Sequence, residues 1–221
     1  GSSGRMRYGI ISDVHSNLTA LEAVMRALED VDALISPGDI VGYGPDPNEC
    51  CSALRAAGCS AVIGNHDAVV AGLIDESWFN PYARAAAQHN RKSLTPENLS
   101  YLGILPVSHT AEDFELVHAT ASQPLSFHYV FSAGSARECL EALKGCSVCL
   151  IGHTHVSEVY SQRVGRLAVD RLSLVGGGMI ELKEDYRYVV NCGSVGQPRD
   201  GNPLAACGVY DSEARTVQVL R

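Results

Sequence analysis

The first third of the chain alternates short apolar runs with segments of helical periodicity. Residues 8–12 form an apolar run, and apolar side chains then recur three or four positions apart over residues 18–28. Further apolar runs occupy residues 33–36 and 61–63, and Pro47 opens an expected helix that reaches about position 57. Alternating strands and helices are typical of a parallel sheet with helices on its faces.

The middle of the chain is more helical, and the last third is rich in short strands. Pro81 and Pro96 each open an expected helix, reaching positions 92 and 102. A strand at 114–118, a helix at 135–144 and a strand at 148–151 follow. After Gly152 we expect short strands at 156–160, 167–170, 179–182, 186–191, 205–211 and 216–220. This tail predicts a second, largely antiparallel sheet.

The chain length and composition suit one globular domain. The 221 residues are 46% hydrophobic, which is normal for a protein with a buried core, and no repeat or linker divides them. Residues 1–5 read as the remnant of an expression tag before Met6. A single domain over residues 6–221 is therefore expected, built from two packed sheets.

Charge and cysteine content exclude several kinds of protein. The net charge of −8 leaves no basic footprint for extended nucleic-acid binding. No apolar run has the length of a membrane span, and the first one is too short for a signal sequence. A cytoplasmic protein is therefore expected, with its eight cysteines as thiols. Cys146 and Cys149 form a C-x-x-C pair without a second pair, which is a weak metal or redox signal. A homo-oligomer is compatible with the sequence.

Four polar clusters each follow an expected strand. They are Asp13-Val14-His15, Gly38-Asp39, Gly64-Asn65-His66-Asp67 and Gly152-His153-Thr154-His155. The carboxyl ends of parallel strands meet at one edge of a sheet, so clusters far apart in sequence are expected to lie together. Residues at i and i+2 of an extended segment point the same way, which turns both members of D-x-H and H-x-H inward. Imidazoles with carboxylates suit divalent manganese, iron, zinc or nickel.

At these residues the sequence resembles the calcineurin-like metallophosphoesterase superfamily. The pattern of that family is D-x-H, G-D-x-x-G, G-N-H-D or G-N-H-E, a lone histidine after a strand, and G-H-x-H. The matching positions are Asp13 and His15; Gly38, Asp39 and Gly42; Gly64 to Asp67; His118; and Gly152, His153 and His155. The stretches 41–48, 79–84 and 191–199 look like a bacterial and archaeal subgroup of small phosphoesterases. The resemblance implies an α/β fold, a four-layer αββα sandwich of two mixed sheets flanked by helices.

The resemblance also implies two divalent metal ions and their ligands. One ion is expected at Asp13, His15 and His155, and the other at Asn65, His118 and His153, with Asp39 as the bridging carboxylate. In such a centre, hydroxide formed from metal-bound water attacks phosphorus, and Asn65 helps to neutralise the phosphoryl oxygens.

Other residues receive roles from the same resemblance. His66 is expected to protonate the leaving alkoxide while its ring is oriented by donating a hydrogen bond to the Asp67 carboxylate; a purely hydrogen-bonding role for His66 is the alternative. Tyr43 is expected at the mouth of the site, and Arg199 within reach of a phosphate. Two departures from the family pattern concern Ala119, where glycine usually follows the lone histidine, and Cys192, which replaces a proline and is expected to bring a thiol near the site.

The resulting hypothesis is a metal-dependent phosphoric ester hydrolase. A small phosphodiester is favoured over a phosphomonoester, because no long insertion is visible that would form a groove for a protein substrate. A protein phosphatase and a dinucleoside polyphosphate hydrolase are alternatives. A non-catalytic scaffold on the same fold is a further one, although related scaffolds look as if they have lost ligands that this sequence retains.

Overall fold

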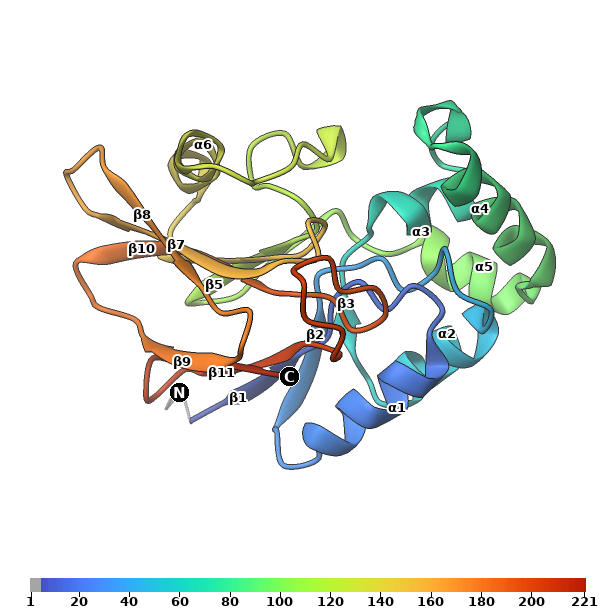
Figure 1. The fold of residues 1–221 in the computed structure, drawn as a ribbon, viewed down its shortest axis with the longest axis horizontal. Coiled ribbons are helices and arrows are strands. Elements are labelled where there is room, and N and C mark those ends of the chain that lie inside the picture. The colour runs from blue at the N-terminus through green and yellow to red at the C-terminus, as the bar shows by residue number, and fades with distance from the viewer. Residues whose placement is uncertain (1–4) are drawn as a thin grey trace.

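The computed structural model describes residues 5–221, so the expected tag remnant lies outside the described residues apart from Arg5. Within this range the chain forms two six-stranded mixed sheets that pack face to face between helices (Figure 1). This arrangement confirms the expected αββα sandwich. No helix in the described range is long and apolar enough to cross a membrane.

The first sheet combines strands from both ends of the chain. Its order is β3 (Ser60–Ala61), β2 (Ala33–Ser36), β1 (Arg7–Ile10), β11 (Cys207–Asp211), β12 (Thr216–Leu220) and β9 (Gly178–Glu181). The first three strands are parallel, and β11 pairs antiparallel with β1, so that Tyr8 lies opposite Tyr210.

In the second sheet the three adjacent strands β5, β6 and β10 run parallel to one another. The order of this sheet is β4 (Ser108–Thr110), β5 (Phe114–Val117), β6 (Val148–Ile151), β10 (Tyr186–Cys192), β7 (Ser157–Arg163) and β8 (Val169–Ser173).

The prediction that the strands after Gly152 form a second sheet by themselves is wrong. Half of these strands extend the first sheet, because alternation along a strand specifies which face is buried but not which strand it pairs with.

Helices cover the outer faces of the two sheets. On the first sheet lie α1 (Leu18–Ala27), whose start is capped by Asn17, and α2 (Pro47–Ala56). Helix α6 (Ala133–Ala142) packs on the second sheet. At one end of the molecule gather α3 (Asn65–Val70), α4 (Pro81–Ser93) and α5 (Pro96–Gly103) (Figure 1). The helix starts expected at Pro47, Pro81 and Pro96 are confirmed.

Three layers of buried side chains hold these elements together. The central layer lies between the sheets, where Ile10 and Ile35 of the first sheet join Leu116 and Leu150 of the second. Burying a side chain of this size stabilises the fold by about 1.5–3 kcal/mol before conformational entropy is deducted. Because β1, β2, β3, β5 and β6 are fixed by this packing, the loops that follow them are held in fixed positions as well.

Candidate metal centre

The loops that follow strands of both sheets bring the seven predicted ligands together. Asp13 and His15 follow β1, Asp39 follows β2, and Asn65 begins α3 after β3. From the second sheet, His118 follows β5, and His153 and His155 follow β6. The site therefore lies where the ends of two sheets meet, whereas the strand-end argument from sequence placed it at one sheet edge.

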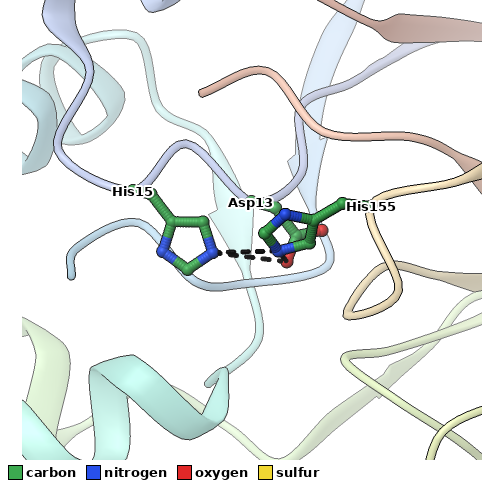
Figure 2. A group of neighbouring side chains, drawn as sticks. All are labelled: Asp13, His15 and His155. Atoms are coloured by element: carbon green, nitrogen blue, oxygen red, sulfur yellow. Dashed lines mark hydrogen bonds and ion pairs between the residues drawn. The ribbon is translucent and has the colours of Figure 1, made fainter. Parts of the chain in front are cut away.

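Asp13, His15 and His155 form the first group of candidate ligands (Figure 2). All three are buried, and one ligand atom from each lies within 4.8 Å of the others. His155 Nε2 is 3.2 Å from Asp13 Oδ1 and 3.1 Å from His15 Nε2. The three side chains therefore converge on one point.

Asp39, His118 and His153 form the second group, which is also buried. His118 Nε2 is 3.2 Å from Asp39 Oδ2 and 3.1 Å from His153 Nδ1, and Asn65 Oδ1 is 3.1 Å from the same His118 nitrogen. Asp39 Oδ2 is also only 3.6 Å from His15 Nε2 of the first group. Asp39 thus lies between the two groups, where a bridging carboxylate has to be.

The four histidines turn their remaining ring nitrogens to backbone carbonyls. These contacts are His15 Nδ1 to Val41 O at 3.0 Å, His118 Nδ1 to Pro37 O at 2.9 Å, His153 Nε2 to Phe127 O at 2.9 Å and His155 Nδ1 to Gln197 O at 2.6 Å. A carbonyl only accepts, so each outer nitrogen donates its N–H. In a neutral ring the inner nitrogen then directs its lone pair toward the group centre, as in histidines that bind a metal, and His118 reaches this state by losing its inner proton when a metal binds. The residues present therefore fit divalent cations.

Burial and mutual charge set the ionisation of the groups. Burial lowers the pKa of His15 and of His153 to about 3, so both rings are neutral at pH 7. Burial acts in the same sense on His118, but the nearby Asp39 carboxylate outweighs it and raises the pKa to about 9. Burial would raise the pKa of Asp13 and Asp39, yet His155 and His118 respectively lower it, so both carboxylates are ionised. Buried carboxylates of this kind need cationic partners.

Five of the seven candidate ligands have left-handed backbone. The φ angles are 52° at Asp13, 49° at His15, 57° at Asp39, 72° at His153 and 59° at His155. The sequence argument that i and i+2 side chains converge because the backbone is extended is therefore wrong for both D-x-H and H-x-H. Such φ values are uncommon outside glycine and concentrate at functional sites, where the surrounding structure holds the strain.

Asp67 has a different role from the expected one. Among the described residues it forms no hydrogen bond with His66. Its Oδ2 instead accepts from the N–H groups of Asp39 at 2.8 Å and Gly64 at 3.1 Å, and its Oδ1 accepts from Val41 N–H at 3.1 Å. Burial, reinforced by the charge of Asp39, raises the pKa of Asp67 to about 7. Asp67 therefore positions the loop that carries Asp39 and does not orient His66.

Ring packing holds His66 in place. The ring centroid of His66 lies 4.4 Å from that of Phe79, 4.7 Å from that of Tyr43 and 4.8 Å from that of His15. The residue is 6% exposed, and its buried Nδ1 has no hydrogen-bond partner in the described part of the chain. Burial also lowers the pKa of this imidazole. His66 thus lies beside the candidate ligands, and its Nδ1 is free to bond with a bound molecule.

Tyr43 and Arg199 lie next to the candidate ligands. The Tyr43 ring is 4.9 Å from the His15 ring, and the Arg199 guanidinium lies 5.7 Å from the Tyr43 centroid, with Nη2 3.4 Å from the Tyr43 hydroxyl. Cys192 instead packs in the core between the sheets, where burial raises the pKa of its thiol. The expectation of a thiol near the site is thereby corrected. Ala119 is buried without a positive φ, so its methyl group is accommodated.

Three supporting residues carry no sequence signal that we recognised. Asn90 of α4 accepts from Gly42 N–H at 2.7 Å and from the Ser16 hydroxyl at 2.8 Å through its Oδ1, which joins two loops of the site. Phe127 supplies the carbonyl that holds His153, and Tyr129 stacks on the His153 ring at 3.9 Å and 14°. A lone asparagine, a backbone carbonyl and a loop tyrosine belong to no motif, so only the tertiary structure shows them.

The sequence and the fold of this chain are both similar to those of known proteins. A model of the calcineurin-like phosphoesterase superfamily domain matches residues 6–214. An uncharacterized protein from Methanocaldococcus jannaschii is 34% identical over an alignment of 218 residues, which covers 96% of this chain and 85% of that protein. A metallophosphoesterase from Sphaerobacter thermophilus has a crystal structure that is similar with a TM-score of 0.83, at 38% identity, over 98% of this chain and 87% of the other. A hypothetical protein from Pyrococcus horikoshii shares the fold, with a TM-score of 0.77 at 16% identity over 97% of this chain and 87% of the other.

Proposed function

The chain belongs to the calcineurin-like phosphoesterase superfamily, and we propose that it hydrolyses small phosphoesters, diesters in preference to monoesters, with two divalent cations. The observation that carries this proposal is the pair of buried carboxylate–histidine groups joined by Asp39. The ionised carboxylates of Asp13 and Asp39 and the inner nitrogens of the histidines would be stabilised by a cation in each of the two adjacent groups.

In this proposal each group holds one cation. Asp13, His15 and His155 hold the first; His118, His153 and the Asn65 amide oxygen hold the second; Asp39 is shared. The mixture of imidazole and oxygen donors suits manganese, iron, zinc or nickel, without selecting one of them. When bound, the two cations would supply Lewis acidity and positive charge for the phosphoryl oxygens.

Residues of the chain position the ester and manage the proton. Asn65 turns its Oδ1 to His118, which leaves its amide N–H groups to donate to a phosphoryl oxygen. His66 is the proton donor for the leaving oxygen. Burial lowers the pKa of its imidazole in the free protein, and a bound phosphoester anion acts in the opposite direction because it stabilises the imidazolium. Arg199, beside Tyr43, supplies an exposed cation at the edge of the site.

The preferred substrate and the cellular location are further parts of the proposal. A small ester is favoured because the sequence shows no long insertion that would form a groove for a protein substrate. A reducing compartment, the cytoplasm, suits the eight cysteines, all of which are free thiols.

A metal-replacement assay tests the proposal. The protein is treated with a chelator, reloaded separately with Mn²⁺, Fe²⁺, Zn²⁺ or Ni²⁺, and assayed on bis-4-nitrophenyl phosphate, 4-nitrophenyl phosphate, a dinucleoside polyphosphate and a phosphopeptide. Loss of activity on chelation, recovery with at least one metal and the highest kcat/KM on the diester support it. His118→Ala should stay inactive in every metal.

The matched control is His89→Ala, because His89 is exposed on α4 and lies outside the ligand groups. It should behave as the wild-type protein does. Absence of hydrolysis with all four metals and all four substrates would support the scaffold alternative instead. A higher kcat/KM on the phosphopeptide or the dinucleoside polyphosphate would replace the diester with that substrate class.

A further inference from the structure

A pocket of about 630 Å³ opens beside the candidate metal centre. Asn65, His66 and His153 are among the residues that line it, so it is continuous with the place where a phosphoryl group would be held. Its volume falls within the range of about 300–1,000 Å³ that is usual for pockets that bind small molecules. A phosphoryl group alone is much smaller than this space, which leaves room for the rest of a substrate.

Aromatic side chains of the segment before α4 form one wall of the pocket. Phe79 lies against His66, with ring centroids 4.4 Å apart and planes 33° from parallel. Trp78, the last residue of the short helix η1 (Glu76–Trp78), lines the same wall and is 90% exposed. An indole left in water next to a pocket is an unfavourable arrangement for folding alone, and it is typical of a ligand-binding surface.

A second wall comes from the segment between β5 and α6. Tyr129 stacks on the ring of His153 at a centroid distance of 3.9 Å and 14° between planes. Phe127 accepts from His153 Nε2 through its carbonyl at 2.9 Å, and it has a left-handed φ of 50°. Phe79 packs on His66 and Tyr129 stacks on His153, so each aromatic wall adjoins a histidine of the candidate site.

The pocket has almost no charge of its own. Among the described residues that line it there is no lysine or arginine, and Asp75 is the carboxylate. A second phosphate or an acidic peptide placed here would meet that carboxylate, and the Arg199 guanidinium beside Tyr43 lies at the edge of the pocket without lining it. Flat aromatic rings, by contrast, gain from stacking against Trp78, Phe79 and Tyr129.

We propose that this pocket binds the leaving alcohol and selects phosphoesters whose leaving alcohol carries an uncharged aromatic ring. The inference rests on the proposed function, in which His66 protonates the leaving oxygen. Because Phe79 packs on His66, the group attached to that oxygen extends between the two aromatic walls. A nucleobase and a simple aryl group share this chemistry, and the experiments below separate them.

Trp78 makes binding measurable without catalysis, because it is the single tryptophan of the sequence. The zinc-loaded protein is titrated with 2-phenylethylphosphonate and 2-cyclohexylethylphosphonate, which lack an ester bond and differ only in the aromaticity of the ring. The phenyl compound should bind about ten-fold more tightly, the size of one good ring contact, and should change the Trp78 emission. Equal affinities, or binding without a change in emission, would overturn the inference.

Two variants and one control test whether the preference for the phenyl compound arises in this pocket. Phe79→Leu should remove most of the ten-fold preference, and Tyr129→Leu, on the other wall, tests the same point if Phe79→Leu fails to fold. Tyr82→Leu is the control, because Tyr82 is 85% exposed in the neighbouring helix and does not line the pocket. Tyr82→Leu should keep the full preference; an equal loss in this variant would contradict the assignment of the pocket.

Hydrolysis separates this inference from the proposed function. Benzyl and cyclohexylmethyl esters of methyl phosphate have leaving alcohols of similar acidity, so their ratio of kcat/KM reports the ring and should be about ten. Adenosine 5′-methyl phosphate is compared with its ribose counterpart that lacks the base. A preference in this pair as well assigns the pocket to nucleobases, whereas a preference in the benzyl pair alone assigns it to simple aryl groups. If the protein binds the phenyl compound selectively but hydrolyses none of the esters, the proposed function is contradicted and the ring pocket is supported. If it hydrolyses the esters with equal kcat/KM within both pairs, the ring pocket is contradicted and the proposed function is supported.

Discussion

Asp67→Asn distinguishes the role of Asp67 in the structure from the role expected by family resemblance. The carboxylate accepts from Asp39 N–H and Gly64 N–H at Oδ2 and from Val41 N–H at Oδ1. An asparagine keeps one acceptor oxygen, which satisfies the pair at Oδ2 and leaves Val41 N–H facing the Nδ2 donor. A buried donor without a partner costs about 1–3 kcal/mol, and a neutral acceptor weakens the two remaining bonds.

The lost and weakened bonds lower the free energy of unfolding by about 2–4 kcal/mol. Asparagine also removes a buried charge whose pKa is raised to about 7, and this offsets part of that loss once the carboxylate is ionised. Urea denaturation of the metal-free protein at pH 8 measures the net fall. The control is Asp185→Asn, whose carboxylate is exposed and pairs with Arg163 at the surface. That change should cost less than about 0.5 kcal/mol. If the two variants have the same stability, the three backbone bonds do not hold the loop.

The metal dependence and the rate of hydrolysis test the role of Asp67 independently in the same variant. Displacing Asp39 weakens metal binding, so Asp67→Asn should raise the metal concentration needed for half-maximal activity. At metal saturation its rate should fall by one common factor on good and poor leaving groups. A loss that grows as the leaving group becomes more basic would show that Asp67 acts through His66, and would refute the positioning role.

Three further changes test other parts of the site. His66→Ala should lose roughly 10²–10⁴-fold in kcat on an alkyl leaving group and far less on 4-nitrophenolate, and equal losses would exclude a proton donor. Gly42→Ala should lower kcat more than ten-fold, because a Cβ at Gly42 would lie 2.6 Å from His66 Nδ1, whereas Gly58→Ala imposes similar backbone strain with no atom within 4 Å and should leave kcat unchanged. The pKa of buried His118 is raised from 6.5 to about 9, so it stabilises the metal-free protein fully below pH 6.5 and loses this contribution as the pH rises through 9. Thermal unfolding should show a decline on the order of 3 kcal/mol over that range without metal and none with it; a rise would contradict the assigned charge of His118.

The positions of the candidate ligands at strand ends could be predicted from the sequence because strand patterns are local, whereas their roles as ligands came from the family resemblance. Short apolar runs fix the strands, and Asp13, Asp39, Asn65 and His118 come directly after strands whose ends the packed sheets bring together. Proline at the first helical turn likewise marks helix starts without tertiary information.

What the sequence did not predict depends on contacts between distant segments. The pairing of β11 with β1 follows from packing across the whole first sheet, so the tail could not be assigned to one sheet in advance. Asp67 follows His66 in sequence, yet its carboxylate turns toward the Asp39 loop. Trp78 and Tyr129 lie in irregular segments, where apolar side chains follow neither helical nor strand periodicity.

Metal content tests the central claim most directly. The wild-type protein, His15→Ala, His118→Ala and Asp39→Asn are reloaded with zinc, passed through a desalting column and analysed for bound metal by mass spectrometry. The account predicts two ions per wild-type chain, loss of one ion in each histidine variant because each belongs to a different group, and weakened retention of both ions in Asp39→Asn. One ion or none in the wild-type protein, or retention of both in all three variants, would contradict it.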